Sequence, residues 1–358
     1  MILTTAPEKI RVVVVDDCVA ARRVIISQLS CDSGIVVAGE AGNGLEALKM
    51  VLDLKPDLVT IDMEMPVMGG LSAIEQIMAR SPVPILVLTA RDDADAAFSA
   101  LAKGALEVLE KPRADRLGTS LARKIRMLAG VSLASHLRKD RNPQGSLSRL
   151  SRTPSPRVSL RGVVAIASST GGPKALSVIL SSLPPDLPAP ILIAQHMSEG
   201  FTEGMANWLN MNSRLAVHIA TEGTAIVPGN VYISPSERNM RVGLDGMLLL
   251  EERQLNEIYR PSCDHLLSSV ARVYGKRSIG VILTGMGSDG SLGMARIRAA
   301  GGATIAQDER SSVIFGMPKA AIDSGCIDLV LPLDKISAEL VKRLWITFSV
   351  TTTGPGAN

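Results

Sequence analysis

The chain has 358 residues and a mass of 37.8 kDa, a length typical of about two domains. Hydrophobic residues make up 46% of the chain, so each half has enough apolar side chains to bury a core. No apolar run approaches the ~18 residues that cross a membrane, and the first residues lack the layout of a signal peptide. The four cysteines are too widely spaced for a zinc cluster or a disulfide framework. These features exclude membrane-spanning and disulfide-rich classes, and we expect a cytoplasmic protein.

The net charge of +3 conceals an uneven distribution of charge along the chain. Residues 113–161 hold 12 Lys/Arg and 2 Asp/Glu, a local charge of +10, whereas the rest of the chain carries 26 basic and 33 acidic residues. Ser, Arg, Pro and Gly dominate residues 131–160, which predicts a flexible basic linker. The basic stretch raises the alternative of a DNA-binding regulator, but aromatic residues are only 3% of the chain and no helix-turn-helix is evident after residue 162. We therefore expect no nucleic-acid partner.

Residues 10–112 alternate short apolar runs with amphipathic segments. This alternation predicts a parallel sheet that helices cover on both faces. The expected strands are 12–15, 36–38, 58–61, 85–88 and 107–109, with helices between them, such as 45–54 and 71–79, and a further helix at 117–128.

Polar side chains follow four of these five strands. They are Asp16 and Asp17 after the first strand, Asp62 after the third, Thr89 after the fourth and Lys111 after the fifth. Ligands of open α/β sheets bind at the carboxyl ends of strands, where a Mg²⁺ ion would relieve the repulsion between carboxylates. Asp62 could then act as a nucleophile toward a phosphoryl donor, with Lys111 and Thr89 holding the phosphoryl oxygens. Any single aspartate could be an ordinary turn residue, but five such residues in this order favour a site.

These residues belong to motifs that resemble the receiver domain of two-component response regulators: Val14-Val15-Asp16-Asp17, Asp62-Met-Glu-Met-Pro-Val-Met-Gly-Gly70, Thr89-Ala90 and Lys111-Pro112. The resemblance covers about residues 8–128 and implies a flavodoxin-like fold. It also implies that Asp62 is the phospho-acceptor and that Asp16, Asp17 and Asp62 hold Mg²⁺. Receivers often carry an aromatic residue three positions before the lysine. This chain has Val108 there, a departure that bears on the coupling of Thr89 to such a residue.

Regular periodicity resumes at Gly162 and predicts a second α/β domain with a Rossmann-like, doubly wound parallel sheet and a hairpin near residues 243–246. We therefore expect a receiver at 1–128, a linker at 129–160, a catalytic domain at 161–346 and a disordered tail at 347–358. The expected strands are 163–167, 191–194, 215–219, 231–233, 247–250, 279–283, 303–306 and 329–331, and the expected helices are 173–183, 202–211, 264–273, 291–300, 318–323 and 334–345.

A turn of small residues, Ser168-Ser169-Thr170-Gly171-Gly172-Pro173, follows the first strand of this domain. The two glycines permit a sharp turn, and proline suits the first position of the helix that follows. Ser169 would lie at the tip of the turn, as in a nucleophile elbow, although Ala167 stands where Gly-x-Ser-x-Gly has its first glycine. The same turn could instead bind an anion at the helix N-terminus.

A base and an orienting acid can be chosen by their places at neighbouring strand ends. His196 directly follows a buried strand, so it would share an edge of the sheet with Ser169 and could accept the serine proton. Asp289 ends the glycine-rich loop that follows a third strand, although an ordinary Asp-Gly turn is the simpler interpretation. The backbone N–H of Met286, together with Thr170, could stabilise an oxyanion.

These stretches resemble the chemotaxis methylesterase domain over about residues 160–346: Ser169-Thr-Gly-Gly172, Gln195-His-Met197, Tyr259-Arg-Pro-Ser262, Leu283-Thr-Gly-Met-Gly-Ser-Asp-Gly290, Gly301-Gly-Ala-Thr-Ile-Ala-Gln-Asp-Glu309 and Phe315-Gly-Met-Pro318. The resemblance implies hydrolysis of glutamate methyl esters on methyl-accepting chemoreceptors, which releases methanol, and deamidation of receptor glutamines. It implies that Ser169 is the nucleophile, His196 the base and Asp289 the orienting acid. Asn239 departs from the family, whose members often have histidine there, and we expect this to affect substrate contact.

A receiver joined to this domain implies a phosphorylation-switched hydrolase that serves sensory adaptation. The resemblance implies that a chemotaxis histidine kinase phosphorylates Asp62 and that the unphosphorylated receiver covers the esterase cleft. We expect a monomer that needs Mg²⁺ only in the receiver and meets membranes only through the receptors. Two alternatives stay open: a phospho-regulated binding module with an esterase-like domain, and the same enzyme in a pathway other than swimming. The basic linker is either a spacer or a segment that steers the enzyme toward acidic receptor helices or an anionic membrane surface.

Overall fold

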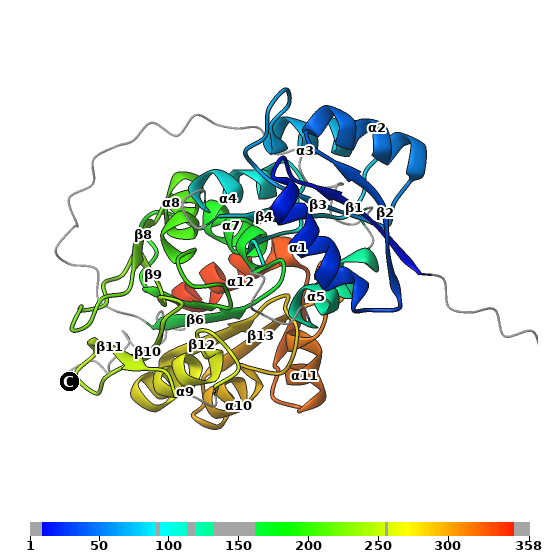
Figure 1. Ribbon diagram of the computed structural model, residues 1–358. Coiled ribbons are helices and arrows are strands. Elements are labelled where there is room, and N and C mark those ends of the chain that lie inside the picture. Colours follow the sequence, from blue (N-terminus) through cyan, green and yellow to red (C-terminus); the bar gives the residue numbers. More distant parts are fainter. Residues whose placement is uncertain are drawn as a thin grey trace, which may run out of the picture. The chain divides into compact units, whose positions relative to one another are not determined.

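The structure is a computed structural model that describes residues 9–90, 94–112, 119–131, 133, 162–254 and 257–346. The chain divides into two compact units, Met1–Leu137 and Arg138–Asn358. Each unit contains its own parallel β-sheet with helices packed against it (Figure 1). Most of the predicted linker and all of the predicted tail lie outside the described residues. Within the described residues, no helix is long and apolar enough to cross a membrane.

The first unit contains a five-stranded parallel sheet with the order β2-β1-β3-β4-β5, which confirms the predicted flavodoxin-like receiver fold. Helices α1 and α5 contact each other on one face, and α2, α3 and α4 cover the other (Figure 1). Burial of the strands on both faces explains their continuous apolar runs. The strands are β1 Ile10–Val15, β2 Ile35–Ala41, β3 Leu58–Ile61, β4 Ile85–Thr89 and β5 Glu107–Glu110, and the helices are α1 Val19–Ser30, α2 Gly44–Leu54, α3 Gly70–Arg80, α4 Ala94–Ala102 and α5 Thr119–Ala129.

The second unit contains a seven-stranded parallel sheet with the order β14-β13-β12-β6-β7-β9-β8. The chain leaves β6 toward β7 and later returns to β12 on the other side, so the switch point of the sheet lies between β6 and β12. The strands are β6 Val163–Ser168, β7 Ile191–Gln195, β8 Ala216–Ile219, β9 Asn230–Ile233, β12 Ser278–Ile282, β13 Ala303–Gln307 and β14 Leu329–Leu331. The helices are α7 Gly172–Ser182, α8 Thr202–Asn212, α9 Cys263–Tyr274, α10 Ser291–Ala299, α11 Met317–Asp323 and α12 Leu333–Ile346, with the short 3₁₀ helix η2 Gly275–Arg277.

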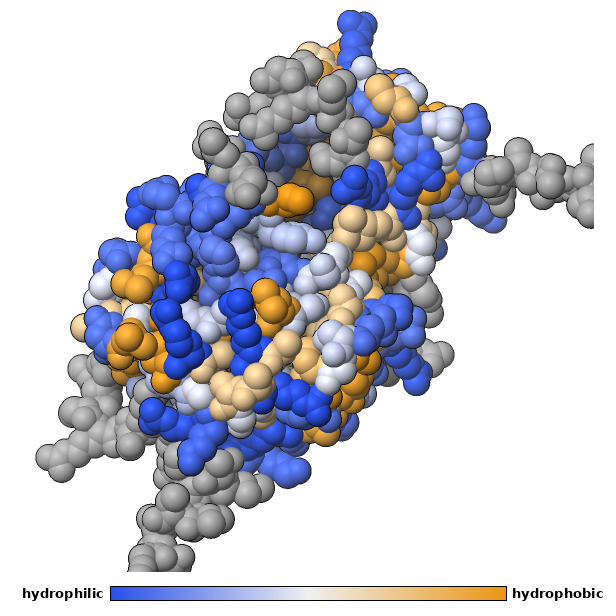
Figure 2. Space-filling model, turned by 90° about the horizontal axis from the view of Figure 1, so that it is seen from below, coloured by the Kyte–Doolittle hydropathy of each residue, from blue (hydrophilic) through white to orange (hydrophobic). Residues whose placement is uncertain are grey.

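A two-stranded antiparallel hairpin, β10 Arg238–Val242 and β11 Leu248–Glu252, stands beside this parallel sheet. It packs on α9, and Val242 N donates a hydrogen bond to the hydroxyl of Ser269 at 3.0 Å. The sequence predicted β11 but not β10, because the polar residues of β10 interrupt its apolar side chains. The face of this unit that carries α9 and α10 mixes hydrophilic and isolated hydrophobic side chains (Figure 2).

Candidate active site and phosphorylation pocket

Ser169 lies in a tight turn between β6 and α7, at the switch point of the second sheet. Its N–H donates to the carbonyl of Thr284 at 3.0 Å, and its carbonyl accepts from Gln195 Nε2 at 2.8 Å. The turn requires glycine: Gly171 has φ of 77°, and a Cβ on Gly172 would overlap the Gln195 side chain. The Ser169 side chain is therefore held at a rigid turn and retains 8% of its exposure.

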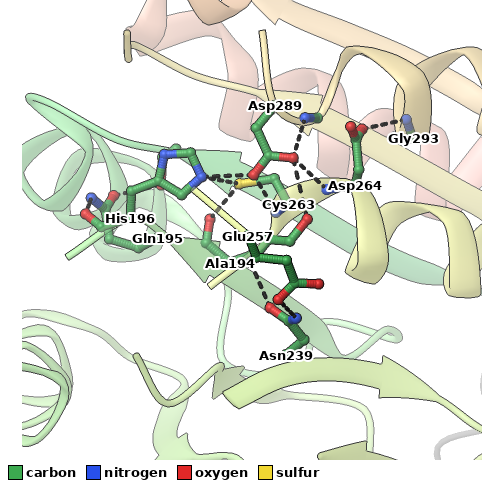
Figure 3. A network of polar contacts seen from close by, with 12 residues as sticks. Ala194, Gln195, His196, Asn239, Glu257, Cys263, Asp264, Asp289 and Gly293 are labelled. Carbon is green, nitrogen blue, oxygen red and sulfur yellow. Dashed lines mark hydrogen bonds and ion pairs between the residues drawn. The ribbon is translucent and has the colours of Figure 1, made fainter. Parts of the chain in front are cut away.

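His196 follows β7, and its Nε2 lies 2.7 Å from Asp289 Oδ2 (Figure 3). Its backbone N–H donates to the carbonyl of Ser168 at 2.9 Å, so the histidine backbone runs beside the residue that precedes Ser169. The ring of Tyr259 stacks on the imidazole with 5.0 Å between centroids and 13° between planes. The histidine ring is thus fixed on one side by a carboxylate and on one face by an aromatic ring.

Asp289 is almost fully buried, and several donors in addition to His196 surround its carboxylate. The backbone N–H groups of Cys263, Asp264 and Gly290 donate to it at 2.7, 3.0 and 3.1 Å, and the Ser262 hydroxyl at 3.3 Å. Burial by itself would raise the pKa of Asp289, but the hydrogen bond and charge of His196 and these backbone donors lower it. The carboxylate is therefore ionised in the folded protein. The sequence did not predict that the start of α9 supplies these donors.

The loop after β12 brings Met286 next to the serine turn. A Cβ placed on Gly285 would lie 2.7 Å from Ser169 Cβ, so the backbone of this loop touches the serine. Thr170 is buried, and its carbonyl accepts from the Thr284 hydroxyl at 2.8 Å. Both candidate oxyanion groups, Met286 and Thr170, therefore belong to segments that border Ser169, and their role stays a prediction.

Asn239 differs from the expectation that it contacts substrate, because its side chain is fully buried. Its Nδ2 donates to Glu257 at 2.7 Å, and its Oδ1 accepts from the backbone N–H of Ser262 at 2.8 Å. It therefore connects β10 to the segment that carries Glu257 and Ser262, and Figure 3 shows its contact with Glu257. The sequence analysis missed this segment as part of the site. The only signal for it was the motif Tyr259-Arg-Pro-Ser262.

The acidic pocket of the first unit contains the predicted carboxylates at the carboxyl ends of β1 and β3. Lys111 Nζ lies 2.7 Å from Asp62 Oδ2 and 2.9 Å from Asp16 Oδ2. Asp16, Asp17 and Asp62 each offer an oxygen within 4.8 Å of the others. Burial raises the pKa of Asp62, Lys111 opposes this rise and the charge of Asp16 adds to it. Excess negative charge in a buried pocket with oxygen ligands fits a divalent cation.

Thr89 lies at the end of β4, and its carbonyl accepts from the Lys111 N–H at 2.9 Å. Its hydroxyl is buried and has no hydrogen-bond partner among the residues that the structure describes. A buried hydroxyl of this kind costs free energy unless it meets an acceptor. It therefore fits an incoming anionic oxygen next to Asp62. Val108 lies on β5 where receivers often have an aromatic ring.

The two folds and their sites define the class of this protein: a response-regulator receiver followed by a hydrolase domain built on a Rossmann-like parallel sheet. Family models agree, since residues 12–122 match the response regulator receiver domain and residues 164–340 match the CheB methylesterase. The curated protein-glutamate methylesterase/protein-glutamine glutaminase 3 of Paramagnetospirillum magneticum is 45% identical over 93% of this chain and 96% of its own length. The corresponding protein of Pyrococcus horikoshii is 40% identical over 94% of each chain. The chain belongs to the family of protein-glutamate methylesterases/protein-glutamine glutaminases.

Solved structures are similar to each half of the chain. The CheB methylesterase catalytic domain of Thermotoga maritima is 40% identical, with a TM-score of 0.49, and covers 51% of this chain and 97% of its own. The response regulator domain of the same organism's CheB is 33% identical, with a TM-score of 0.32, and covers 35% of this chain and 99% of its own.

Proposed function

We propose that this protein hydrolyses glutamate methyl esters on methyl-accepting chemoreceptors and deamidates receptor glutamines, under control of aspartyl phosphorylation. The observation that carries the proposal is the His196–Asp289 pair at 2.7 Å, which stands at the sheet switch point beside the Ser169 turn. The names of the relatives, which state both activities, support the same conclusion. A binding module would not need an ionised aspartate held by three backbone N–H groups behind a histidine.

Ser169 is the nucleophile in this proposal, and His196 accepts its proton through Nδ1. The assignment of Nδ1 follows because Nε2 faces Asp289, so the carboxylate holds the ring proton on Nε2. Ser169 Oγ attacks the ester carbonyl, and the backbone N–H of Met286 with Thr170 stabilises the oxyanion. The protonated Nδ1 then donates to the departing methoxide, and methanol leaves a glutamyl-serine acyl-enzyme.

Water completes the reaction by the same proton transfers. Nδ1 of His196 takes a proton from water, the hydroxide attacks the acyl carbonyl, and the proton returns to Ser169 Oγ as glutamate is released. A glutamine side chain follows the same course, with ammonia as the leaving group instead of methanol. One site therefore accounts for both activities: Ser169 supplies the proton that leaves with methanol or ammonia, and water supplies the proton that returns to Ser169.

Asp62 is the phospho-acceptor in this proposal, and Asp16, Asp17 and Asp62 would hold Mg²⁺. The ion, when bound, supplies positive charge that stabilises the transferring phosphoryl group. Lys111 contacts both Asp16 and Asp62, so it can turn to a phosphoryl oxygen on Asp62. The unpartnered Thr89 hydroxyl can donate to a second oxygen. Phosphorylation thereby changes the charge and hydrogen bonding of the pocket, which is the local event that a switch requires.

The partners follow from this function. We expect methyl-accepting chemoreceptors as substrates, a chemotaxis histidine kinase as the phosphodonor, a cytoplasmic location and a monomeric protein. The unphosphorylated receiver is expected to restrain the esterase, so a phosphodonor should raise the rate. The basic stretch 113–161, which includes the linker and carries a local charge of +10, suits an electrostatic approach to acidic receptor helices.

A methanol-release assay on methylated receptor membranes tests the proposal. The full chain should release methanol, a small-molecule phosphodonor with Mg²⁺ should increase the rate, and Ser169→Ala should abolish release. Asp62→Asn should reduce the ratio of rates with and without phosphodonor to about one, because its amide cannot accept a phosphoryl group. Asp57→Asn, on the same unit, is the matched control and should keep the stimulation.

Two results would contradict the proposal. Unchanged methanol release by Ser169→Ala would exclude this serine as the nucleophile. Retained stimulation in Asp62→Asn would place the switch elsewhere.

A further inference from the structure

Three side chains that can bind a metal converge at Nε2 of the proposed catalytic histidine: His196 itself, Cys263 and Asp289. Cys263 is fully buried at the start of α9, and its Sγ lies 3.4 Å from His196 Nε2. Asp289 Oδ2 lies 2.7 Å from the same nitrogen, and the three ligand atoms all lie within 4.8 Å of one another. Figure 3 shows the imidazole nitrogen, the thiol sulfur and the carboxylate oxygen directed toward one point.

The geometry points to an inhibitory site for a borderline-soft divalent metal such as Zn²⁺, formed by His196, Cys263 and Asp289. One imidazole nitrogen, one thiolate and one carboxylate are a ligand set that Zn²⁺ accepts. With Zn–N of about 2.0 Å and Zn–S of about 2.3 Å, a tetrahedral ion places N and S about 3.5 Å apart, close to the 3.4 Å observed. The same geometry places N and O about 3.3 Å apart, so His196 Nε2 and Asp289 Oδ2 would need to separate by about 0.6 Å from their 2.7 Å.

The displaced protons explain why the metal would inhibit. The ion takes the place of the Nε2 proton between His196 and Asp289, and this proton moves to Nδ1, so the imidazole stays neutral. Cys263 loses its thiol proton to solvent and binds as thiolate. The metal charge of +2 is then balanced by one thiolate and one carboxylate. Nδ1 now carries a proton and has no lone pair for Ser169, so the base is lost.

Cobalt spectroscopy of the full chain tests the site without reference to activity. Chelator-treated protein is titrated with Co²⁺ in excess Mg²⁺, which occupies carboxylate sites such as that of Asp16, Asp17 and Asp62. A thiolate–cobalt charge-transfer band and strong tetrahedral visible bands should appear at one equivalent per chain. Cys263→Ala and Cys263→Ser should both lose the charge-transfer band. Cys326→Ser, which removes the other buried cysteine, should keep it.

Inhibition is the second measurement, and this part rests on the proposed esterase function. Zn²⁺ should inhibit methanol release, and a chelator should restore it. Half inhibition of Cys263→Ala should need at least about tenfold more Zn²⁺ than half inhibition of the wild type. The rate of each protein is compared with its own metal-free rate. Tryptophan fluorescence verifies folding, since both tryptophans lie in the second unit. Absence of the thiolate band in the wild-type chain overturns the site. Equal Zn²⁺ sensitivity of wild type and Cys263→Ala overturns the inhibition. Failure of the esterase function leaves the cobalt spectrum unaffected, so the two failures are distinguishable.

Discussion

His196 presents Nε2, and not Nδ1, to Asp289, at 2.7 Å. In the serine proteases of the chymotrypsin type the aspartate faces Nδ1 and the serine faces Nε2. In the mechanism proposed for this protein, the roles of the two ring nitrogens are therefore exchanged. The consequence for chemistry is the same, because an ionised aspartate on one nitrogen leaves the other free to accept the serine proton.

Asp289→Asn tests this tautomer. The amide can keep its oxygen for the N–H groups of Asp264 and Gly290, which bind Oδ1. Its NH₂ group would then replace Oδ2, where it would face His196 Nε2 and Cys263 N–H and favour the wrong tautomer. We expect kcat for methanol release to fall by about 10⁴-fold, as in comparable triads. Asp323→Asn, at an exposed residue paired with Lys319, is the matched control and should be unaffected. A loss smaller than tenfold in Asp289→Asn would contradict the orienting role.

Asp264 and Asp289 should respond to pH in opposite directions. Burial and the nearby Asp289 raise the pKa of Asp264. The folded state therefore binds a proton on Asp264 more readily than the unfolded state, and the free energy of unfolding rises as pH falls through the raised pKa. This gain in stability is absent at neutral pH. Hydrogen bonding and the charge of His196 outweigh burial and lower the pKa of Asp289. The stability that Asp289 contributes is present above its ordinary pKa and is lost as pH falls below it.

Asp264→Asn isolates the first of these effects. The amide oxygen can still accept from the Gly293 N–H at 2.7 Å, while the repulsion from Asp289 disappears. We expect the free energy of unfolding to rise by about 1 kcal/mol or less at pH 7, and the difference from wild type to shrink as pH falls toward 4. Urea unfolding followed by tryptophan fluorescence measures it, because both tryptophans belong to the second unit. An equal difference at both pH values would exclude charge repulsion as the cause.

Gly285→Ala should displace the proposed nucleophile. The new Cβ would lie 2.7 Å from Ser169 Cβ and would also overlap the sulfur of Met317, so the serine turn must shift. A shift of about 1 Å in a reacting group costs roughly a hundredfold in rate, and methanol release measures it. Gly223→Ala is the control: no atom lies within 4 Å of its Cβ, and only its φ of 71° opposes the substitution. It should lose about 1 kcal/mol of stability and keep its activity.

Asn239→Ala distinguishes positioning from substrate contact. The substitution leaves the Ser262 N–H without its acceptor and removes one of the donors to Glu257, which should cost about 1–3 kcal/mol of stability. Because Ser262 and the N–H groups that follow it hold Asp289, kcat should fall while KM stays the same. Asn230→Ala removes hydrogen bonds to exposed His218 and to the carbonyls of Val227 and Pro228, and it should change neither kcat nor KM. A rise in KM with unchanged kcat would instead support substrate contact.

The sequence by itself determined the order of the two α/β units and the strand ends that carry Asp62, Ser169, His196 and Asp289. It could do so because buried parallel strands are short continuous apolar runs, and the polar residue at which each run stops is visible in the printed chain. The motifs then connected those residues to a receiver and an esterase.

Only the tertiary structure decided how the groups meet. Three features depend on contacts between segments 25 to 93 residues apart. They are the ring nitrogen that His196 turns to Asp289, the donors that α9 offers to that carboxylate, and the approach of Cys263 Sγ to 3.4 Å from His196 Nε2. Asn239 shows the same limit: its departure from the histidine that is frequent in the family suggested an effect on substrate contact, yet the side chain is buried in a hairpin that packs on α9. Hydrogen-bond geometry between distant segments is set by packing, which one-dimensional patterns of polarity do not encode.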